Sequence, residues 1–168
     1  ALVYTAEGMP QDVEAELSLV RQALSHENAP EPLEREGLSG TDHWKSLLGS
    51  PPPGSLLLRG AVPANRTADF VRSQQAELQA GPVLVDVANG MLYAALPGQD
   101  AGRGRAAIES LRQAALAREG YLVVLEGPQA LAGVLDPWGF APDTLDLMKR
   151  IKARWDPYGI LNRGSFIV

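Results

Sequence analysis

The order of strand-like and helix-like segments between residues 55 and 126 is the feature that most constrains the fold of this chain. Short apolar runs predict strands, and longer segments with apolar residues at helical spacing predict helices. Strands are predicted at residues 55–62, 83–87, 91–96 and 121–125, and helices at 65–78 and 105–118. Asn89-Gly90 favours a two-residue hairpin between the second and third strands. The order β-α-β-β-α-β predicts an α+β fold of the ferredoxin-like type, an antiparallel sheet with helices on one face.

Further elements are predicted before this core. Residues 2–5 have the composition of a short strand, which with the following helix could extend the sheet. Proline is favoured at the first helical position, so residues 10–25 are predicted to form a helix. A proline-bearing loop follows, and Thr41 or Asp42 is expected to cap a short helix that ends near Gly49. The first helix has apolar residues on one face, at Val13, Leu17, Val20 and Leu24.

Residues 136–168 add a segment that a sandwich does not need. A turn with the sequence LDPWGF leads to a helix that Pro142 and Asp143 open. Basic residues crowd the second half of this helix, where each stabilises the helix dipole by about 0.3 kcal/mol. The helix ends at Asp156 and an extended tail is expected after it. Its apolar seam is formed by Leu145, Met148, Ile151 and Trp155.

The composition excludes several classes of function. No cysteine is present, which rules out disulfides, thiolate nucleophiles and clusters or zinc held by cysteine. His26 and His43 are the only histidines and lack a metal-binding spacing, so no metal site is predicted. No GxSxG motif marks a serine hydrolase. The net charge of −5 argues against a nucleic-acid-binding surface, and no apolar run is long enough to cross a bilayer.

Length and the N-terminal sequence bear on organisation and location. A chain of 168 residues suffices for one domain with its own core, and we predict a single domain over residues 1–168 whose core spans 55–126. No signal peptide is visible, and a cytoplasmic location is expected. The chain begins at Ala1, directly before strand-like sequence, which favours a piece of a longer protein.

Two charged strand residues are candidates for a site. Arg59 lies in the apolar strand LLLRGAVP, and strand alternation places it with Leu57 on the face opposite Leu58. On an open sheet face its guanidinium could hold a carboxylate through two parallel N–H bonds; the alternative is a solvated side chain whose stem covers the sheet. Asp86 is expected on a polar face, solvated or ion-paired. The loop GQDAGRGR resembles a phosphate cradle only in its glycines, and a plain strand-to-helix connection is favoured.

The C-terminal segment resembles a known family. Residues 147–164, LMKRIKARWDPYGILNRG, are similar to the C-terminal signature of FAD-linked oxidases of the vanillyl-alcohol-oxidase type. Two positions depart from that signature: Trp155 replaces a leucine, and Arg163 replaces a proline that would have fixed the backbone. The matching residues are Asp156, Pro157, Gly159, Ile160, Leu161, Asn162 and Gly164.

Three earlier stretches resemble one subgroup, the FAD-binding subunit of bacterial glycolate oxidase. They are LLLRGAVP, VLVDVANGMLYAAL and GYLVVLEGP, in that order. The resemblance implies a substrate (cap) domain whose sheet covers the flavin ring, with Asn162 and Gly164 close to FAD and Arg59 binding the carboxylate of a small 2-hydroxy acid. Related D-lactate and D-2-hydroxyglutarate dehydrogenases carry histidine-rich metal motifs, which this sequence lacks.

The same resemblance implies partners. The family's FAD pyrophosphate-binding domain lies N-terminal to the cap and nothing here resembles it, so the isolated chain is expected to bind FAD weakly and to have no turnover. A second flavin subunit and an iron–sulfur subunit are implied, and any membrane association would be through such subunits. No catalytic residue is identified. The alternative from another class is a non-catalytic ferredoxin-like module that binds a ligand or a subunit, because such sandwiches host many functions.

Overall fold

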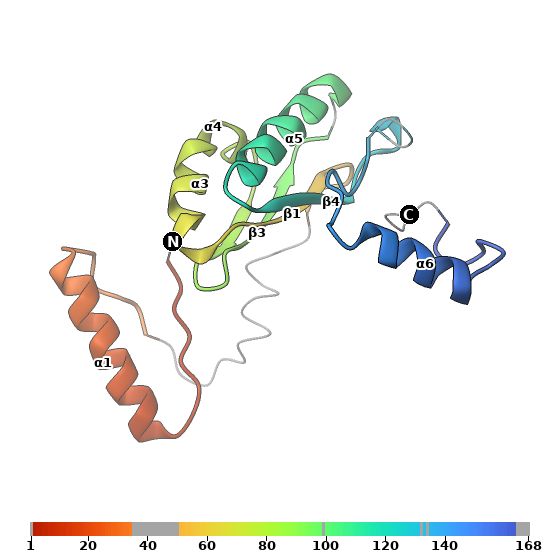
Figure 1. Cartoon of the computed structure of the whole chain (residues 1–168). Helices are drawn as coiled ribbons and strands as arrows, with labels where there is room; N and C mark the ends of the chain where they lie inside the picture. Colours follow the sequence, from red (N-terminus) through yellow and green to blue (C-terminus); the bar gives the residue numbers. More distant parts are fainter. Residues whose placement is uncertain (1, 35–50, 99, 132, 134, 164–168) are drawn as a thin grey trace. The chain divides into compact units, whose positions relative to one another are not determined.

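The computed structural model describes residues 2–34, 51–98, 100–131, 133 and 135–163 (Figure 1). Its chain divides into two compact units, Ala1–Leu47 and Leu48–Val168, and each is described by itself. In the described part of the chain, no helix has the length and apolar character needed to cross a membrane.

The first unit contains one described helix, α1, Pro10–His26, which starts with the expected proline. Its predicted apolar face is half-buried, at Val13, Leu17, Val20 and Leu24. The strand predicted at residues 2–5 is wrong: this segment has no regular structure, and Leu2 is 76% exposed. A strand needs a neighbouring backbone to satisfy its hydrogen bonds, and no described segment of the chain pairs with this one. The helix predicted from Thr41 or Asp42 to Gly49 lies outside the described residues.

The second unit is built on one antiparallel sheet with the strand order β2-β3-β1-β4. The strands are β1, Leu56–Ala61; β2, Val83–Asp86; β3, Met91–Leu96; and β4, Tyr121–Glu126. The helices are α3, Thr67–Ser73; α4, Gln75–Leu78; α5, Ala101–Leu116; and α6, Leu145–Trp155, with 3₁₀ turns at Ala64–Arg66 and Gln129–Leu131. The prediction of a ferredoxin-like α+β fold is confirmed, since each central pairing is antiparallel in the expected order.

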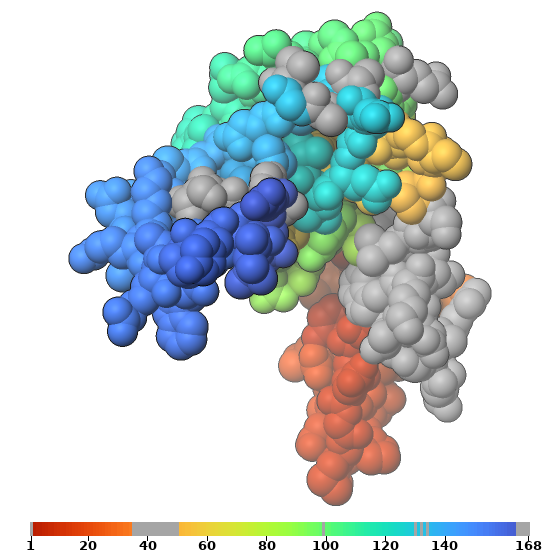
Figure 2. Space-filling view, turned by 90° about the vertical axis from the view of Figure 1, so that its right-hand side faces the viewer, coloured from red at the N-terminus to blue at the C-terminus, as the bar shows by residue number. Residues whose placement is uncertain are grey.

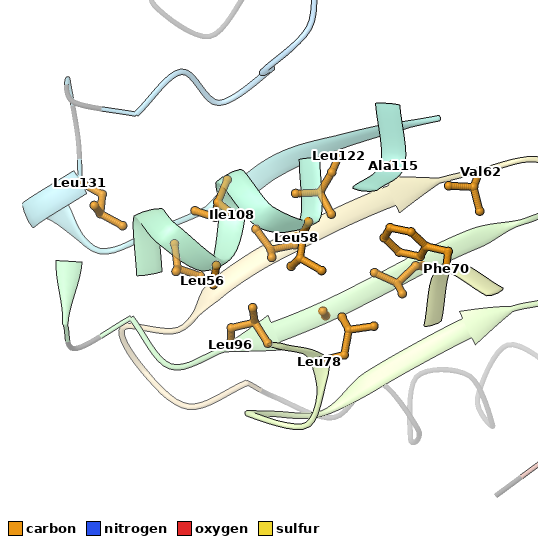
Figure 3. Close-up of a cluster of buried hydrophobic side chains, with 14 residues drawn as sticks. Leu56, Leu58, Val62, Phe70, Leu78, Leu96, Ile108, Ala115, Leu122 and Leu131 are labelled. Atoms are coloured by element: carbon orange, nitrogen blue, oxygen red, sulfur yellow. The ribbon is translucent and has the colours of Figure 1, made fainter. Parts of the chain in front are cut away.

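The core lies between this sheet and the helices α3, α4 and α5, which share one side of it (Figures 1 and 3). Along β1 the side chains alternate, so Leu56 and Leu58 are buried while Leu57 and Arg59 turn to the other face. The buried cluster on the helix side includes Leu56, Leu58, Phe70, Leu92, Ile108, Leu111 and Leu122. Each such side chain stabilises the fold by about 1.5–3 kcal/mol relative to an exposed one.

Local side-chain chemistry changed several predicted boundaries. The helix predicted over residues 65–78 is broken at Gln74, which separates α3 from α4. Between β2 and β3 the loop has four residues, 87–90, and not two, because Asp86 pairs with Met91 and its carboxylate accepts N–H bonds from Asn89.

The glycine-containing stretch that was predicted as a loop before the helix lies mostly within α5. The predicted start near Arg105 is four residues late, because Asp100 caps the helix by accepting the Arg103 N–H at 3.0 Å. The Asp100 carboxylate occupies the position at the helix start where an anion would bind, so this segment is no phosphate cradle. Gly104 is needed for packing, because a Cβ there would lie 2.8 Å from Leu56 Cδ1.

Candidate functional site

The sheet face opposite the helices forms the first part of the candidate site. Strand register places Leu84, Tyr93, Arg59 and Val123 in one row across this face, and Asp86, Met91, Ala61 and Tyr121 in the next row. Most of these side chains are half-buried, neither packed in the core nor fully exposed. These two rows are therefore largely apolar, and Arg59 is the basic residue in them. We refer to these eight residues as the open sheet face.

Arg59 has an unusual environment within this face. Its Nε atom is buried, and in the described part of the chain it has no hydrogen-bond partner. Val123, its neighbour on β4, is only 4% exposed, and Tyr93 flanks it on β3. An unpaired buried donor costs about 1–3 kcal/mol unless some group accepts its hydrogen bond. The predicted placement beside Leu57 and opposite Leu58 is confirmed, while the ligand-binding role stays a prediction.

Asp86 has a structural role in the hairpin. Its carboxylate accepts the Asn89 backbone N–H at 3.1 Å and the Asn89 side-chain amide at 2.7 Å. These bonds to Asn89 hold the pKa of Asp86 below its usual value. Since the carboxylate is committed to this turn, it offers neither a counter-ion for Arg59 nor a general base.

The turn that follows β4 covers the edge of the sheet. Val124 donates its N–H to Pro137 O at 2.8 Å, and the Asp136 carboxylate accepts the N–H groups of Trp138 and Gly139, each at 2.9 Å. The Phe140 ring lies 5.4 Å from the Tyr121 ring, between ring centroids. The LDPWGF segment therefore fastens the C-terminal region to β4 and places an aromatic ring beside the open sheet face.

Arg112 on α5 holds this turn from the helix side. It is 7% exposed and donates from Nε to Leu122 O at 3.2 Å and from an Nη atom to Asp136 O. Burial lowers the pKa of its guanidinium, and the nearby Asp136 carboxylate acts in the opposite direction. Sequence reasoning missed this residue, although Arg112 follows Ile108 by four positions and so falls on the inward face of α5.

The segment after α6 forms a compact turn, residues 156–163, which we call the C-terminal turn. The extended tail expected here is wrong as far as Arg163. Asp156 accepts the N–H of Ile160 at 2.8 Å and that of Leu161 at 3.0 Å, and it also accepts a bond from Lys152 Nζ. These bonds, the one from Lys152 first, lower the pKa of the Asp156 carboxyl below its usual range.

The C-terminal turn presents apolar side chains to its surroundings. Tyr158 is 83% exposed, Ile160 64% and Leu161 56%, next to Trp155 at 79%. In the space-filling view, the C-terminal segment forms a broad exposed surface (Figure 2, blue). Asn162 is exposed with a left-handed φ of 49°, and Gly164 lies outside the described residues. Arg59 and Asn162 share no hydrogen bond in the described part of the chain.

Other places in the described residues offer no comparable site. A hollow beside α1 is lined by Arg21, but this cation is already paired with Glu14 at 3.0 Å and with Glu34 at 2.9 Å. Among the residues that the structure describes, no group of three or more His, Asp or Glu could hold a metal ion. His26 is exposed beside Glu27, and His43 falls outside those residues.

Comparison with known proteins finds a family that resembles the C-terminal part of the chain. Residues 137–166 match the family model of the FAD linked oxidases, C-terminal domain. This match supports an FAD-dependent oxidoreductase cap domain. It covers the turn after β4, α6 and the C-terminal turn, and it implies an N-terminal FAD-binding domain as a partner. A search of curated proteins found no significant match, and a search of solved structures found none either.

The match confirms the coarser part of the predicted resemblance. The segment that carried the prediction, residues 147–164, lies within the matched range. The match supports FAD use and a role as part of an oxidoreductase, because the matched model is that of the FAD linked oxidases. The closeness to glycolate oxidase and to the vanillyl-alcohol-oxidase type stays a prediction.

Proposed function

We propose that this chain is the substrate (cap) domain of an FAD-dependent oxidoreductase that oxidises a small 2-hydroxy acid, with glycolate as the model substrate. In this proposal residues 1–168 form one cap domain, and the FAD pyrophosphate-binding domain is supplied by other sequence. FAD, when bound, would supply the redox chemistry, as the acceptor of a hydride from the substrate carbon. The residues of this chain bind and orient the acid and exclude water from it. A second flavin subunit, an iron–sulfur subunit and a cytoplasmic location belong to the same proposal.

The observation that carries the proposal is the buried Arg59 Nε on the open sheet face, which has no hydrogen-bond partner among the described residues. A guanidinium presents N–H donors in a planar fork that matches a carboxylate, and a charge-assisted pair is stronger than a neutral hydrogen bond. Among the described residues no group accepts a hydrogen bond from Arg59 Nε, which leaves this donor available to a substrate carboxylate. Tyr93 and Val123 are the neighbours of Arg59 on the two adjacent strands, and in this proposal they limit the size of the acid next to it.

The surroundings of Arg59 suit a flat ring as well as a small acid. Leu84, Met91 and Ala61, all half-buried, give the open sheet face an apolar surface in two neighbouring rows. An apolar surface of this kind can lie against an aromatic ring system and remove it from water. By the family resemblance, Asn162 and Gly164 would lie close to the cofactor.

Arg59→Lys in the full-length protein, with its FAD-binding domain, tests the substrate assignment. Lysine keeps the charge but loses the planar fork, so we expect the KM for glycolate to rise about tenfold or more, with a smaller change in kcat. The variant should also discriminate less between glycolate and its uncharged methyl ester. Arg66→Lys is the matched control, because Arg66 is exposed on the 3₁₀ turn after β1.

Two outcomes would contradict the proposal at different levels. Unchanged kinetics in Arg59→Lys would remove this residue from the substrate site. A full-length wild-type protein that retains no FAD and oxidises no 2-hydroxy acid would refute the oxidoreductase itself, and would favour the non-catalytic ligand- or subunit-binding module.

A further inference from the structure

A buried acid at the end of α6 organises the C-terminal turn. Asp156 is 7% exposed, although Trp155 before it and Tyr158 after it are both widely exposed. Its two carboxylate oxygens accept the N–H groups of two successive residues, Ile160 and Leu161. Backbone N–H groups that converge on one carboxylate fix the chain between them, because each bond removes conformational freedom from the turn.

Lys152 closes the same network from one helical turn earlier. Its Nζ donates to the Asp156 carboxylate and also to Leu161 O. The ammonium therefore joins the helix to the far end of the turn, and Leu161 is held through both its N–H and its carbonyl. The bonds of this network run between residues 152 and 161, so it can loosen without breaking the sheet or its core.

The arrangement places polar groups inside and apolar groups outside. A terminal segment that only capped a core would bury its apolar side chains and expose its charges. Here the Asp156 side chain is 4% exposed and that of its partner Lys152 23%, while Ile160 and Leu161 are more than half exposed. Two left-handed residues, Gly159 with φ 62° and Asn162 with φ 49°, give the turn a backbone shape that depends on being held. A fixed turn with outward apolar side chains is suited to meeting a binding surface without further ordering.

We infer that Asp156, bridged by Lys152, is a positioning residue that preorganises residues 158–162 for contact with the flavin and the domain that holds it. This inference rests on the proposed function. Asp156 touches neither substrate nor cofactor; it acts by fixing the backbone of Ile160, Leu161 and the adjoining Asn162. Its loss would therefore weaken retention of FAD, and would leave binding of the acid at Arg59 largely unchanged once FAD is saturating.

The test uses the full-length holoenzyme with Asp156→Asn. The amide has nearly the shape of the carboxylate, but it accepts through one oxygen only and places an NH₂ group against N–H donors. Lys152→Met is a second variant, which removes the bridge and keeps the acid. Asp143→Asn is the matched control, because Asp143 is an exposed acid just before α6.

Three measurements separate the possible roles. Hydrogen exchange at the Ile160 and Leu161 amides should become about tenfold faster in Asp156→Asn, and the dissociation constant of FAD should rise about tenfold. The KM for glycolate at saturating FAD should stay within about twofold of wild type, which is the opposite pattern from Arg59→Lys. Lys152→Met should act in the same direction, and Asp143→Asn should leave all three quantities unchanged.

Each contrary result refutes a distinct part of the reasoning. Unchanged exchange at Ile160 and Leu161 would show that Asp156 does not hold the turn. Faster exchange with unchanged FAD affinity would show that the turn does not serve the flavin, while the substrate role of Arg59 would stand on its own kinetics. A wild-type protein without FAD would overturn the proposed function, and this inference with it.

Discussion

Gly139 occupies a position where a single methyl group is expected to be costly. It has a left-handed φ of 66°, and a Cβ built on it would lie 2.1 Å from Arg112 Nε and 2.2 Å from Arg112 Cζ. In Gly139→Ala the left-handed backbone costs about 1 kcal/mol. The guanidinium must also move, which breaks its bonds to Leu122 O and Asp136 O. Leaving the carbonyl of the buried Leu122 unpaired costs about 1–3 kcal/mol, and losing the bond to the part-buried Asp136 carbonyl costs about 0.5–1.5 kcal/mol, so with the backbone cost we expect a total of about 2.5–5.5 kcal/mol.

The measurement is urea denaturation of the 168-residue chain followed by far-UV circular dichroism, with the slope against urea checked for constancy. Gly54→Ala is the matched control, because Gly54 has a φ of 79° and nothing lies within 4 Å of its built Cβ. It should cost about 1 kcal/mol, the backbone contribution alone. In an Arg112→Met background, the added cost of Gly139→Ala should fall to a similar value, since the clash is gone.

Equal losses in Gly139→Ala and Gly54→Ala would refute the role given to Arg112. So would a Gly139→Ala penalty that stays the same in the Arg112→Met background. Either result would mean that the turn after β4 is held by its own Asp136 bonds and not from α5.

Two further predictions concern charged groups at helix ends. Because the pKa of Asp156 is depressed by its hydrogen bonds, the stabilisation it gives to the C-terminal turn is present above the ordinary aspartate pKa and is lost as pH falls through the depressed folded value. The amide resonances of Ile160 and Leu161 should therefore stay constant from pH 7 down to about 4 and change only below it; a change centred between pH 5 and 6 would contradict this. Asp100→Ala should lower the free energy of unfolding by about 1 kcal/mol in the urea assay, because it removes the cap on the Arg103 N–H. Asp100→Asn keeps an acceptor oxygen and should cost less, so equal losses in both variants would argue against capping.

The elements that could be predicted are those governed by local periodicity. The strands around Leu58, Leu84, Ala94 and Val123 were expected within about two residues of their ends, because apolar runs and turn residues are local signals. The strand at residues 2–5 was wrong because a strand is stable only beside another backbone, which no local pattern reports. The late start predicted for α5 arose from its glycines, whose low helix propensity was outweighed by the Asp100 cap and by packing of Gly104 on Leu56.

Some features of the candidate site could be predicted from the sequence and others could not. The family resemblance at residues 147–164 was readable because it lies in one continuous segment. The roles of Arg112 and Asp156 were not readable, because both depend on bonds to residues further along the chain. In the sequence, Arg112 is one more helix position and Asp156-Pro157 is an ordinary helix stop.

The sequence by itself determined the order of strands and helices along the chain, because apolar runs and turn residues are local signals. It also determined the face on which Arg59 lies, because side chains alternate along a strand with a period of two residues. Only the tertiary structure decided that Arg59 Nε is removed from water with no partner in the described part of the chain, since that depends on neighbours from β3 and β4. The bonds from the Ile160 and Leu161 N–H groups to the Asp156 carboxylate span only four and five residues, so they belong to a local turn that the structure was needed to reveal. The surroundings of Arg59 depend instead on strands from distant parts of the chain, whose pairing no local pattern specifies.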